Sequence, residues 1–162
     1  MTHGCRVPTL LGALIGLALP SSVLAQVAPP DSAQSRKIVA LVEKAAALVN
    51  ARGKATFDEF RKQGSEWFEG ETYLFAYDQR ANVLLNPAFP RREGTNVSGQ
   101  TDTAGKKFHD LMLETVRTKG AGWVDYLFPK PGRIAASHKW AYVKAVTIDG
   151  APGLIGAGFY VD

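Results

Sequence analysis

A lysine and several aromatic residues near the C-terminus have the side-chain chemistry of an anion-binding pocket. The segment "KWAYVKAV" places Lys139 three residues before Tyr142, and the segment "GAGWVDYLFPKPG" combines Trp123 with Tyr126. An ammonium group supplies charge, phenol hydroxyls supply directed hydrogen bonds, and aromatic rings exclude water. We therefore predict that Lys139 supplies the charge for an anionic ligand, and that Tyr126 and Tyr142 supply its hydrogen bonds.

Each of these side chains also has a structural interpretation. Trp123 and Tyr126 differ in strand parity, so a regular strand directs them to opposite faces of its sheet, and at least one is structural unless a bulge intervenes. We favour Tyr126 as the ligand-facing residue of the two. The alternatives remain that the aromatic residues are ordinary core, and that Lys139 is an exposed lysine at the edge of a strand.

Residues 86–102, "NPAFPRREGTNVSGQTD", are the expected lid of such a pocket. The segment contains two prolines and two glycines, too many for a regular element, and loops of this length inside a compact domain are often functional. We expect Asn86, Phe89 or Asn96 to close over the ligand, with Arg91 and Arg92 as the next candidates for holding the anion. The complete predicted ligand-binding set adds one residue from the segment "TYLFAYD": Tyr73, Asn86, Phe89, Asn96, Trp123, Tyr126, Lys139 and Tyr142.

The histidine and charge content argues against several other kinds of site. His109 and His138 stand far apart without a metal-ligand spacing around them, so both are interpreted as surface or capping residues, and no metal or other cofactor is predicted. No nucleophile, base and orienting acid form a local set, so the chain is not predicted to be an enzyme, and a small hydrolase or isomerase is the lowest-ranked alternative. The net charge is +4, and the basic residues are scattered among acidic ones, which argues against a nucleic-acid partner.

Residues 1–25 have the layout of a secretory signal peptide. Arg6 gives a short basic start, an apolar run covers residues 10–19, and small residues end the segment at Ala25. The apolar run is about half of the roughly 20 residues that a membrane-spanning helix needs, which argues against the alternative of a transmembrane anchor. We expect cleavage after Ala25, a periplasmic or secreted mature protein without cysteine, and an extended lead-in over residues 26–32.

Apolar residues at helical spacing predict two helices in the first part of the mature chain. The first begins at about residue 33, with Asp31 and Gln34 as its capping box, and Gly53 is its stop signal. The second is short. It begins at a capping box formed by Thr56 and Glu59 and ends near the glycine that follows.

A third helix and a set of strands follow. The helix closes at Gly120 and is capped by Asp102 or Thr103. The segments "TYLFAYD", "VLL", "GWVDYLF", "KWAYVKAVTI" and "LIGAGFYV" have strand-like composition and are joined antiparallel by turns, which predicts an α+β domain. Because both alternations are apolar, the first helix is expected on one face of the sheet, and the loop with the third helix on the other. In the last strand, Gly156 and Gly158 leave either a hollow or a point of close backbone packing.

The succession of these segments resembles the single Cache domain of the second type, an extracytoplasmic PAS-like ligand-sensing module. The resemblance covers nearly the whole mature chain, residues 33–162, and its most specific pieces are "GWVDY-x-FPKP", the spacing of Lys139 and Tyr142, and the closing "IGAGFYVD". It implies a five-stranded antiparallel sheet behind a long helix, with a pocket for a small organic ligand, often a short carboxylate. Members often carry a histidine near position 86, where this sequence has Asn86. Membrane-bound members continue into a transmembrane helix and a signalling domain, so the expectation here is a free-standing secreted form.

Two functional hypotheses follow from the residues and the resemblance. The first is a ligand-binding sensor that captures a small organic acid and presents the complex to a membrane receptor or transporter partner. The alternative is a structural or protein-interaction domain with a vestigial pocket, which the presence of Asn86 makes plausible. A monomer or weak homodimer is expected, because the apolar stripe of the first helix is needed to cover the sheet.

Overall fold

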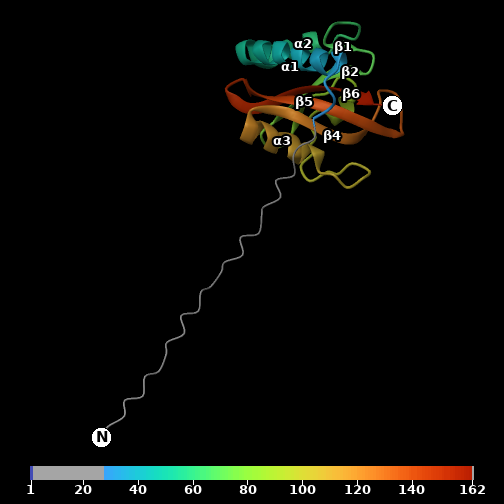
Figure 1. The fold of residues 1–162 in the computed structure, drawn as a ribbon. Coiled ribbons are helices and arrows are strands. Elements are labelled where there is room, and N and C mark those ends of the chain that lie inside the picture. Colours follow the sequence, from blue (N-terminus) through green and yellow to red (C-terminus); the bar gives the residue numbers. More distant parts are fainter. Residues whose placement is uncertain (2–27, 162) are drawn as a thin grey trace.

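A six-stranded antiparallel sheet lies between a long helix, α1, on one face and a shorter helix, α3, on the other (Figure 1). The computed structural model describes Met1 and residues 28–161, so the rest of the predicted signal peptide lies outside the described residues. In chain order the elements are α1 (Ala33–Arg52), the 3₁₀ helix η1 (Gly53–Thr56), α2 (Phe57–Phe60), β1 (Phe68–Glu69), β2 (Thr72–Asp78), β3 (Val83–Leu85), the 3₁₀ helix η2 (Pro90–Arg92), α3 (Phe108–Lys119), β4 (Ala121–Pro129), β5 (Ala136–Ile148) and β6 (Ala151–Val161).

The strand order β1-β2-β6-β5-β4, with β3 paired to β2, places the C-terminal strand in the middle of the sheet. The register aligns Tyr126 of β4 with Lys139 of β5, and Lys139 in turn with Tyr160 of β6. Directly opposed residues of neighbouring strands point to the same face of a sheet. One row across three strands therefore holds a lysine between two tyrosines.

Helix α1 begins at Ala33 as expected, but its N-cap lies one residue later than the predicted Asp31. Ser32 is the N-cap, its Oγ accepts from the Ser35 backbone N–H at 3.0 Å, and the Ser35 Oγ accepts from the Ser32 backbone N–H at 2.9 Å. The predicted box of Asp31 and Gln34 is therefore wrong, and Asp31 instead forms an ion pair with Arg36. The predicted stop at Gly53 is confirmed, since Gly53 caps the helix with a φ of 59° that favours glycine.

Two other capping predictions are wrong for local reasons. The Thr56 hydroxyl donates to the Gly53 carbonyl in the preceding 3₁₀ turn, so it does not cap α2, which is only four residues long. Helix α3 begins after Lys107 without a side-chain cap. The carboxylate of Asp102 accepts backbone N–H groups of its own loop and of Leu127 in β4, so it fastens the loop to the edge of the sheet instead.

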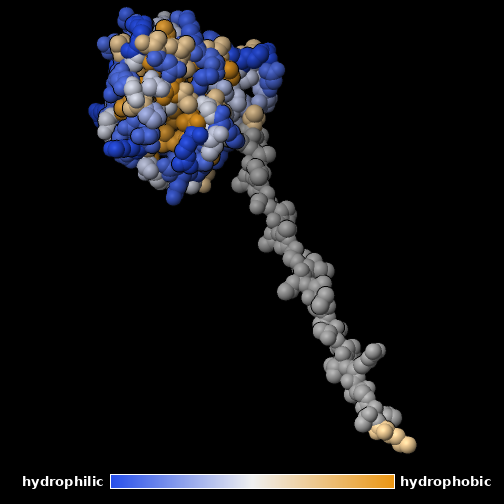
Figure 2. All heavy atoms as spheres, turned by 90° about the vertical axis from the view of Figure 1, so that its left-hand side faces the viewer, coloured by the Kyte–Doolittle hydropathy of each residue, from blue (hydrophilic) through white to orange (hydrophobic). Residues whose placement is uncertain are grey.

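The sheet has an apolar core on each face, as the apolar alternation predicted. The core between the sheet and α1 contains Ile38, Val42, Leu74, Ile155 and Phe159, among others. The opposite core is built from aromatic side chains of β2 and β4 together with α3 and the loop between β3 and α3. The surface drawn in Figure 2 is mostly hydrophilic, with apolar side chains gathered in places between charged ones. No helix within the described residues is long and apolar enough to cross a membrane.

Two of the three glycines of β6, Gly156 and Gly158, provide room for side chains of the second core. A Cβ atom added to Gly156 would lie 2.6 Å from the Phe75 ring, and one added to Gly158 would lie 2.9 Å from Lys139 Cε and 2.3 Å from the Trp140 carbonyl oxygen. Both predicted features are therefore present: the glycines leave a hollow in the strand, and neighbouring groups pack closely into it. Gly158 in particular lets the Lys139 side chain lie flat across the sheet.

Candidate functional site

Lys139 is the centre of the candidate site. Its side chain is only 1% exposed, and Nζ donates a hydrogen bond to the Tyr73 hydroxyl at 2.9 Å. Nζ also lies 4.1 Å from the centre of the Tyr73 ring and 4.9 Å from that of Tyr160. No carboxylate among the described residues forms an ion pair with this lysine. A buried amine surrounded by rings and hydroxyls is an unusual arrangement, because buried cations are normally paired with an acid.

Burial lowers the pKa of Lys139 to about 7, and the negative charge of Glu71 acts in the opposite direction. The physical cause is that the charged ammonium loses its hydration inside the domain. At neutral pH the lysine is therefore divided between its charged and neutral forms. A carboxylate bound beside it would supply the missing counter-charge and favour the charged form.

Four tyrosines of β2, β4 and β6 lie on the same face as Lys139: Tyr73, Tyr77, Tyr126 and Tyr160. Burial raises the pKa of each above its ordinary value, to about 12 for Tyr160, so all four keep their hydroxyl hydrogens at neutral pH. The Tyr160 hydroxyl donates to the Pro129 carbonyl at 2.6 Å, and the Tyr126 ring stacks on Phe108 with centroids 4.1 Å apart. The structure thus brings predicted residues Tyr73, Tyr126 and Lys139 together.

The loop between β3 and α3 supplies a cover through Phe89. Its ring is 6.0 Å from Tyr73 and 5.2 Å from Phe128, centroid to centroid, in edge-to-face contacts. Asn86 is buried and shapes this part of the loop, because its Oδ1 accepts from the Phe89 backbone N–H. Asn96 lies elsewhere: it is exposed, and its amide donates to the Arg80 carbonyl and to Asn82.

Trp123 and Tyr142 are not brought to this site. Their rings contact each other at 5.3 Å and pack against the core beneath α1, on the opposite face of the sheet. The reason is strand parity: positions 139 and 142 differ by an odd number, as do 123 and 126, so a regular strand separates them. The parity argument that separates Trp123 from Tyr126 applies equally to Lys139 and Tyr142.

His109 is a functional candidate that the sequence analysis assigned to the surface or to a cap. Its side chain is 1% exposed, and Nε2 lies 3.1 Å from Nη2 of Arg92. Burial and the charge of Arg92 lower the pKa of His109 to about 3, so the ring is neutral. Because arginine only donates, Nε2 accepts and Nδ1 carries the hydrogen. That buried Nδ1 has no hydrogen-bond partner within the described chain. In the sequence, the helical spacing of His109 to Met112 and Val116 was the signal that could have indicated its burial.

A small cavity of about 210 Å³ adjoins the site on the side of the loop. Arg92, Gln100 and His109 line it, together with the rings of Phe108 and Phe128. Phe128 connects the cavity to the lysine, since its ring centre is 5.5 Å from Arg92 Cζ and 5.8 Å from Lys139 Nζ. Lys139 thus lies in the interior, and the Phe128 ring lies next to both Lys139 and Arg92. Arg92 lines the small cavity, which we call the vestibule.

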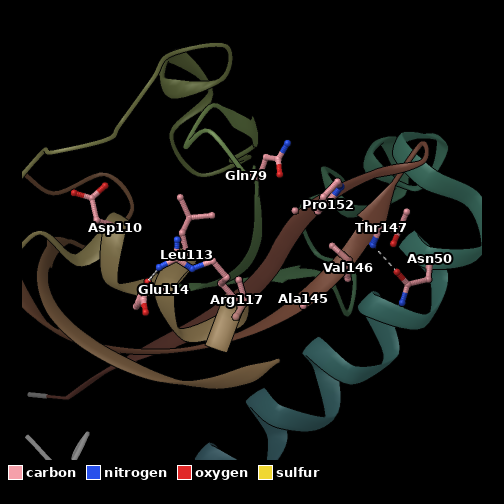
Figure 3. A pocket seen from close by; sticks show the side chains of 12 residues that line it. Asn50, Gln79, Asp110, Leu113, Glu114, Arg117, Ala145, Val146, Thr147 and Pro152 are labelled. Carbon is pink, nitrogen blue, oxygen red and sulfur yellow. Dashed lines mark hydrogen bonds and ion pairs between the residues drawn. The ribbon is translucent and has the colours of Figure 1, made fainter. Parts of the chain in front are cut away.

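A larger groove of about 690 Å³ lies away from Lys139, between α3 and the β5–β6 hairpin (Figure 3). Several of its polar side chains already have partners: Arg117 pairs with Glu114, and Asn50 Oδ1 accepts from the Thr147 backbone N–H at 2.8 Å. Asp110 accepts from Ser98 and Gly99 of the loop. The groove is wider than the vestibule but lacks buried groups in need of a partner, so the lysine site is the stronger candidate.

Comparisons with known proteins agree on one family. The dCache_2 family model, described as a Cache domain, matches residues 57–162. The methyl-accepting chemotaxis protein McpP of Pseudomonas putida is 28% identical over 95 residues, which are 59% of this chain and 17% of that protein. The chain therefore spans less than a fifth of the length of this curated relative.

Solved structures show the same fold. A structure described as the periplasmic sensor domain of a chemotaxis protein is 29% identical, with a TM-score of 0.64, and covers 80% of this chain and 95% of its own. A Cache chemosensory domain solved for the structural basis of its carboxylic acid recognition is 27% identical, with a TM-score of 0.69 and the same shares covered. A Vibrio parahaemolyticus methyl-accepting chemotaxis protein, 19% identical with a TM-score of 0.66, covers 80% of this chain and 90% of its own and supports the fold. A six-stranded antiparallel sheet with a long N-terminal helix is the PAS-like architecture of these domains, and this chain belongs to the Cache domain family.

Proposed function

We propose that this protein is an extracytoplasmic sensor module that binds a short organic carboxylate and presents the complex to a membrane signalling or transport partner. The observation that carries the proposal is the buried Lys139, which has no acidic partner among the described residues and is surrounded by tyrosines. A carboxylate would satisfy the ammonium charge and accept from the phenol hydroxyls.

The size and chemistry of the surroundings favour a small acid. The rings of Tyr73, Tyr160 and Phe128 lie within 6 Å of Nζ, so only a short chain could fit beside the lysine. Phe89 and the loop that carries it must move outward for the ligand to enter, because Lys139 is closed off from solvent. Carboxylic acid recognition by the Cache chemosensory domain that is 27% identical to this chain supports the same ligand class.

Replacing Lys139 by methionine tests the proposal. Loss of a charge-assisted hydrogen bond costs about 1.5–3 kcal/mol, so Lys139→Met should weaken carboxylate binding by roughly ten- to over a hundredfold. The midpoint of thermal unfolding without ligand should stay the same or rise, because methionine fills similar space without a buried amine. Titration calorimetry with acetate, propionate, malonate and succinate provides the measurement.

The matched control is Lys144→Met on the same strand. Lys144 pairs with Glu43 of α1 on the other face of the sheet, so its loss should leave affinity unchanged. Wild-type affinity in Lys139→Met would place the anion elsewhere and refute the role given to Lys139. Absence of binding or thermal stabilisation with every acid, in the wild type, would instead favour the alternative of an interaction domain with a vestigial pocket.

A further inference from the structure

Arg92 is a second cationic side chain beside the site without an acidic partner in the described part of the chain. Its Nη2 donates to Gln100 Oε1 at 3.1 Å and lies 3.1 Å from His109 Nε2. Both acceptors are uncharged, because the histidine is neutral. A guanidinium group has five N–H donors, and these two contacts use only one of its three nitrogens. Nη1 and Nε therefore still carry N–H donors for a further acceptor.

The surroundings of Arg92 contain another unused donor and little competing negative charge. His109 Nδ1 is buried without a partner, next to the guanidinium that holds its Nε2. Asp102 also lines the cavity, but its oxygens accept the backbone N–H groups of Ala104, Lys106 and Leu127. The Glu93 carboxylate is engaged by Arg61 and by the backbone N–H of Asn86. The vestibule thus combines a cation with donors and presents no free acid from these elements.

The distance between the two cations limits what can bridge them. Arg92 Cζ and Lys139 Nζ lie 5.5 and 5.8 Å from the centre of the same Phe128 ring, so their separation is at most the sum of the two. A charge-assisted hydrogen bond of about 2.8 Å at each end takes up about half of that span. Because that sum is reached only with the Phe128 ring directly between the two cations, it is an upper limit, and with carbon–carbon bonds of about 1.5 Å at most about two carbons fit between two carboxylate groups.

We propose that Arg92, with His109 beside it, forms a second carboxylate subsite, so that the ligand is a dicarboxylate of three or four carbons held between Arg92 and Lys139. This inference rests on the proposed carboxylate-binding function and narrows its ligand class. One carboxylate occupies the interior site at Lys139 and the other occupies the vestibule. The dianion matches two cations that lack acidic partners, whereas a monocarboxylate leaves one of them unmatched.

Calorimetry with pairs of acids of equal carbon number tests the subsite in the full-length mature protein. Malonate should bind at least tenfold more tightly than propionate, or succinate at least tenfold more tightly than butyrate. Arg92→Met should abolish this preference, reducing dicarboxylate affinity tenfold or more while leaving monocarboxylate affinity within about twofold. Arg92→Lys, which keeps the charge but loses the guanidinium donors, should retain part of the preference.

Arg91→Met is the matched control, because Arg91 is the exposed neighbour with the same charge. It should leave both affinities unchanged, which separates a specific subsite from a general loss of positive charge. Thermal unfolding of each variant without ligand checks that the loop remains folded.

The outcomes separate this inference from the function on which it rests. Equal affinity for the two members of each pair in the wild type would overturn the dicarboxylate subsite and leave carboxylate binding intact. Equal weakening of both classes by Arg92→Met would also overturn it, because a single carboxylate would then contact both cations. Failure of every acid to bind the wild type would refute the proposed function itself, and the subsite with it.

Discussion

At the scale of single residues, the protein is distinguished by a lysine held in an apolar, aromatic interior. Desolvation disfavours the ammonium form, whereas the faces of Tyr73 and Tyr160 favour it through cation–π attraction. Burial lowers the pKa of Lys139 to about 7, so part of the population is uncharged at neutral pH. A bound anion would favour the charged form, and ligand binding is expected to be linked to proton binding.

Carboxylate affinity should fall as pH rises above 7. Lys139 without ligand has a pKa of about 7, and a bound carboxylate raises that pKa, so binding takes up a proton once the free site is neutral. Affinity should be nearly constant below pH 7 and decrease by up to about tenfold per pH unit above it, until the pKa of the complex is reached. His109 does not contribute, since its pKa is about 3.

Calorimetry between pH 6 and 9, in buffers of different ionisation enthalpy, measures both the affinity and the proton uptake. The same titration on Lys139→Met is the control and should lose the pH dependence. A wild-type affinity that stays constant from pH 6 to 9 without proton uptake would show that Lys139 does not pair with the ligand.

At the scale of elements, a single glycine joins the end of α1 to the β5–β6 hairpin. Gly53 has a φ of 59°, and an added Cβ atom would lie 1.8 Å from the Asp149 carboxylate, which accepts from the Lys54 backbone N–H. Gly64 has a φ of 81° but open space around it. The two glycines thus share a positive φ, but only Gly53 is also crowded by a neighbouring side chain.

Gly53→Ala should destabilise the protein more than Gly64→Ala does. A positive φ in the left-handed region costs roughly 1–2 kcal/mol, and the ψ of −145° at Gly53 lies outside that region, where the strain on alanine is larger. Crowding against Asp149 should add about 1–3 kcal/mol for Gly53→Ala alone. Urea denaturation of the two variants gives the comparison, and Asp149→Ala in the Gly53→Ala background should recover part of the difference. Equal free energies of unfolding would show that the hairpin moves away at little cost.

At the scale of the whole molecule, the sheet separates two functions. The face under α1 is an apolar core, whereas the opposite face combines tyrosines, a lysine, an arginine and a histidine beneath a loop. The loop is fastened at both ends of the site, by Asp102 to β4 and by Glu93 to the start of the loop and to Arg61. In the function we propose, movement of this loop on ligand binding would pass the signal to a partner outside the domain.

Export is the prediction that belongs to the whole chain. The apolar run of residues 10–19 is too short to span a bilayer and ends near a small-residue site, so the mature protein should begin at Gln26 outside the cytoplasm. Mass spectrometry of native protein from the periplasmic or secreted fraction identifies the first residue. Recovery of membrane-bound protein with residues 1–25 still attached would contradict cleavage.

Local patterns in the sequence were enough to predict most of the architecture. Two periodicities and the turn residues between them indicated the helices, the antiparallel strands and the cover on each face, because burial on a helix or strand repeats at a fixed spacing. Lys139 and Tyr126 were selected from residue type and position; the structure brings them to one face, and their role in ligand binding stays a prediction. The capping boxes were less predictable, since Ser32 and Asp31 are both good N-caps and neighbouring bonds decide between them.

Only the tertiary structure decided which residues meet. Tyr73 and Lys139 are 66 positions apart and come together because β6 inserts between β2 and β5, with Gly158 leaving room for the lysine stem. Contacts of this kind depend on strand order and register, which no short sequence pattern records. The same holds for His109, whose partner Arg92 is provided by a loop without periodicity. The sequence by itself determined the elements and their faces, and long-range strand pairing determined the site.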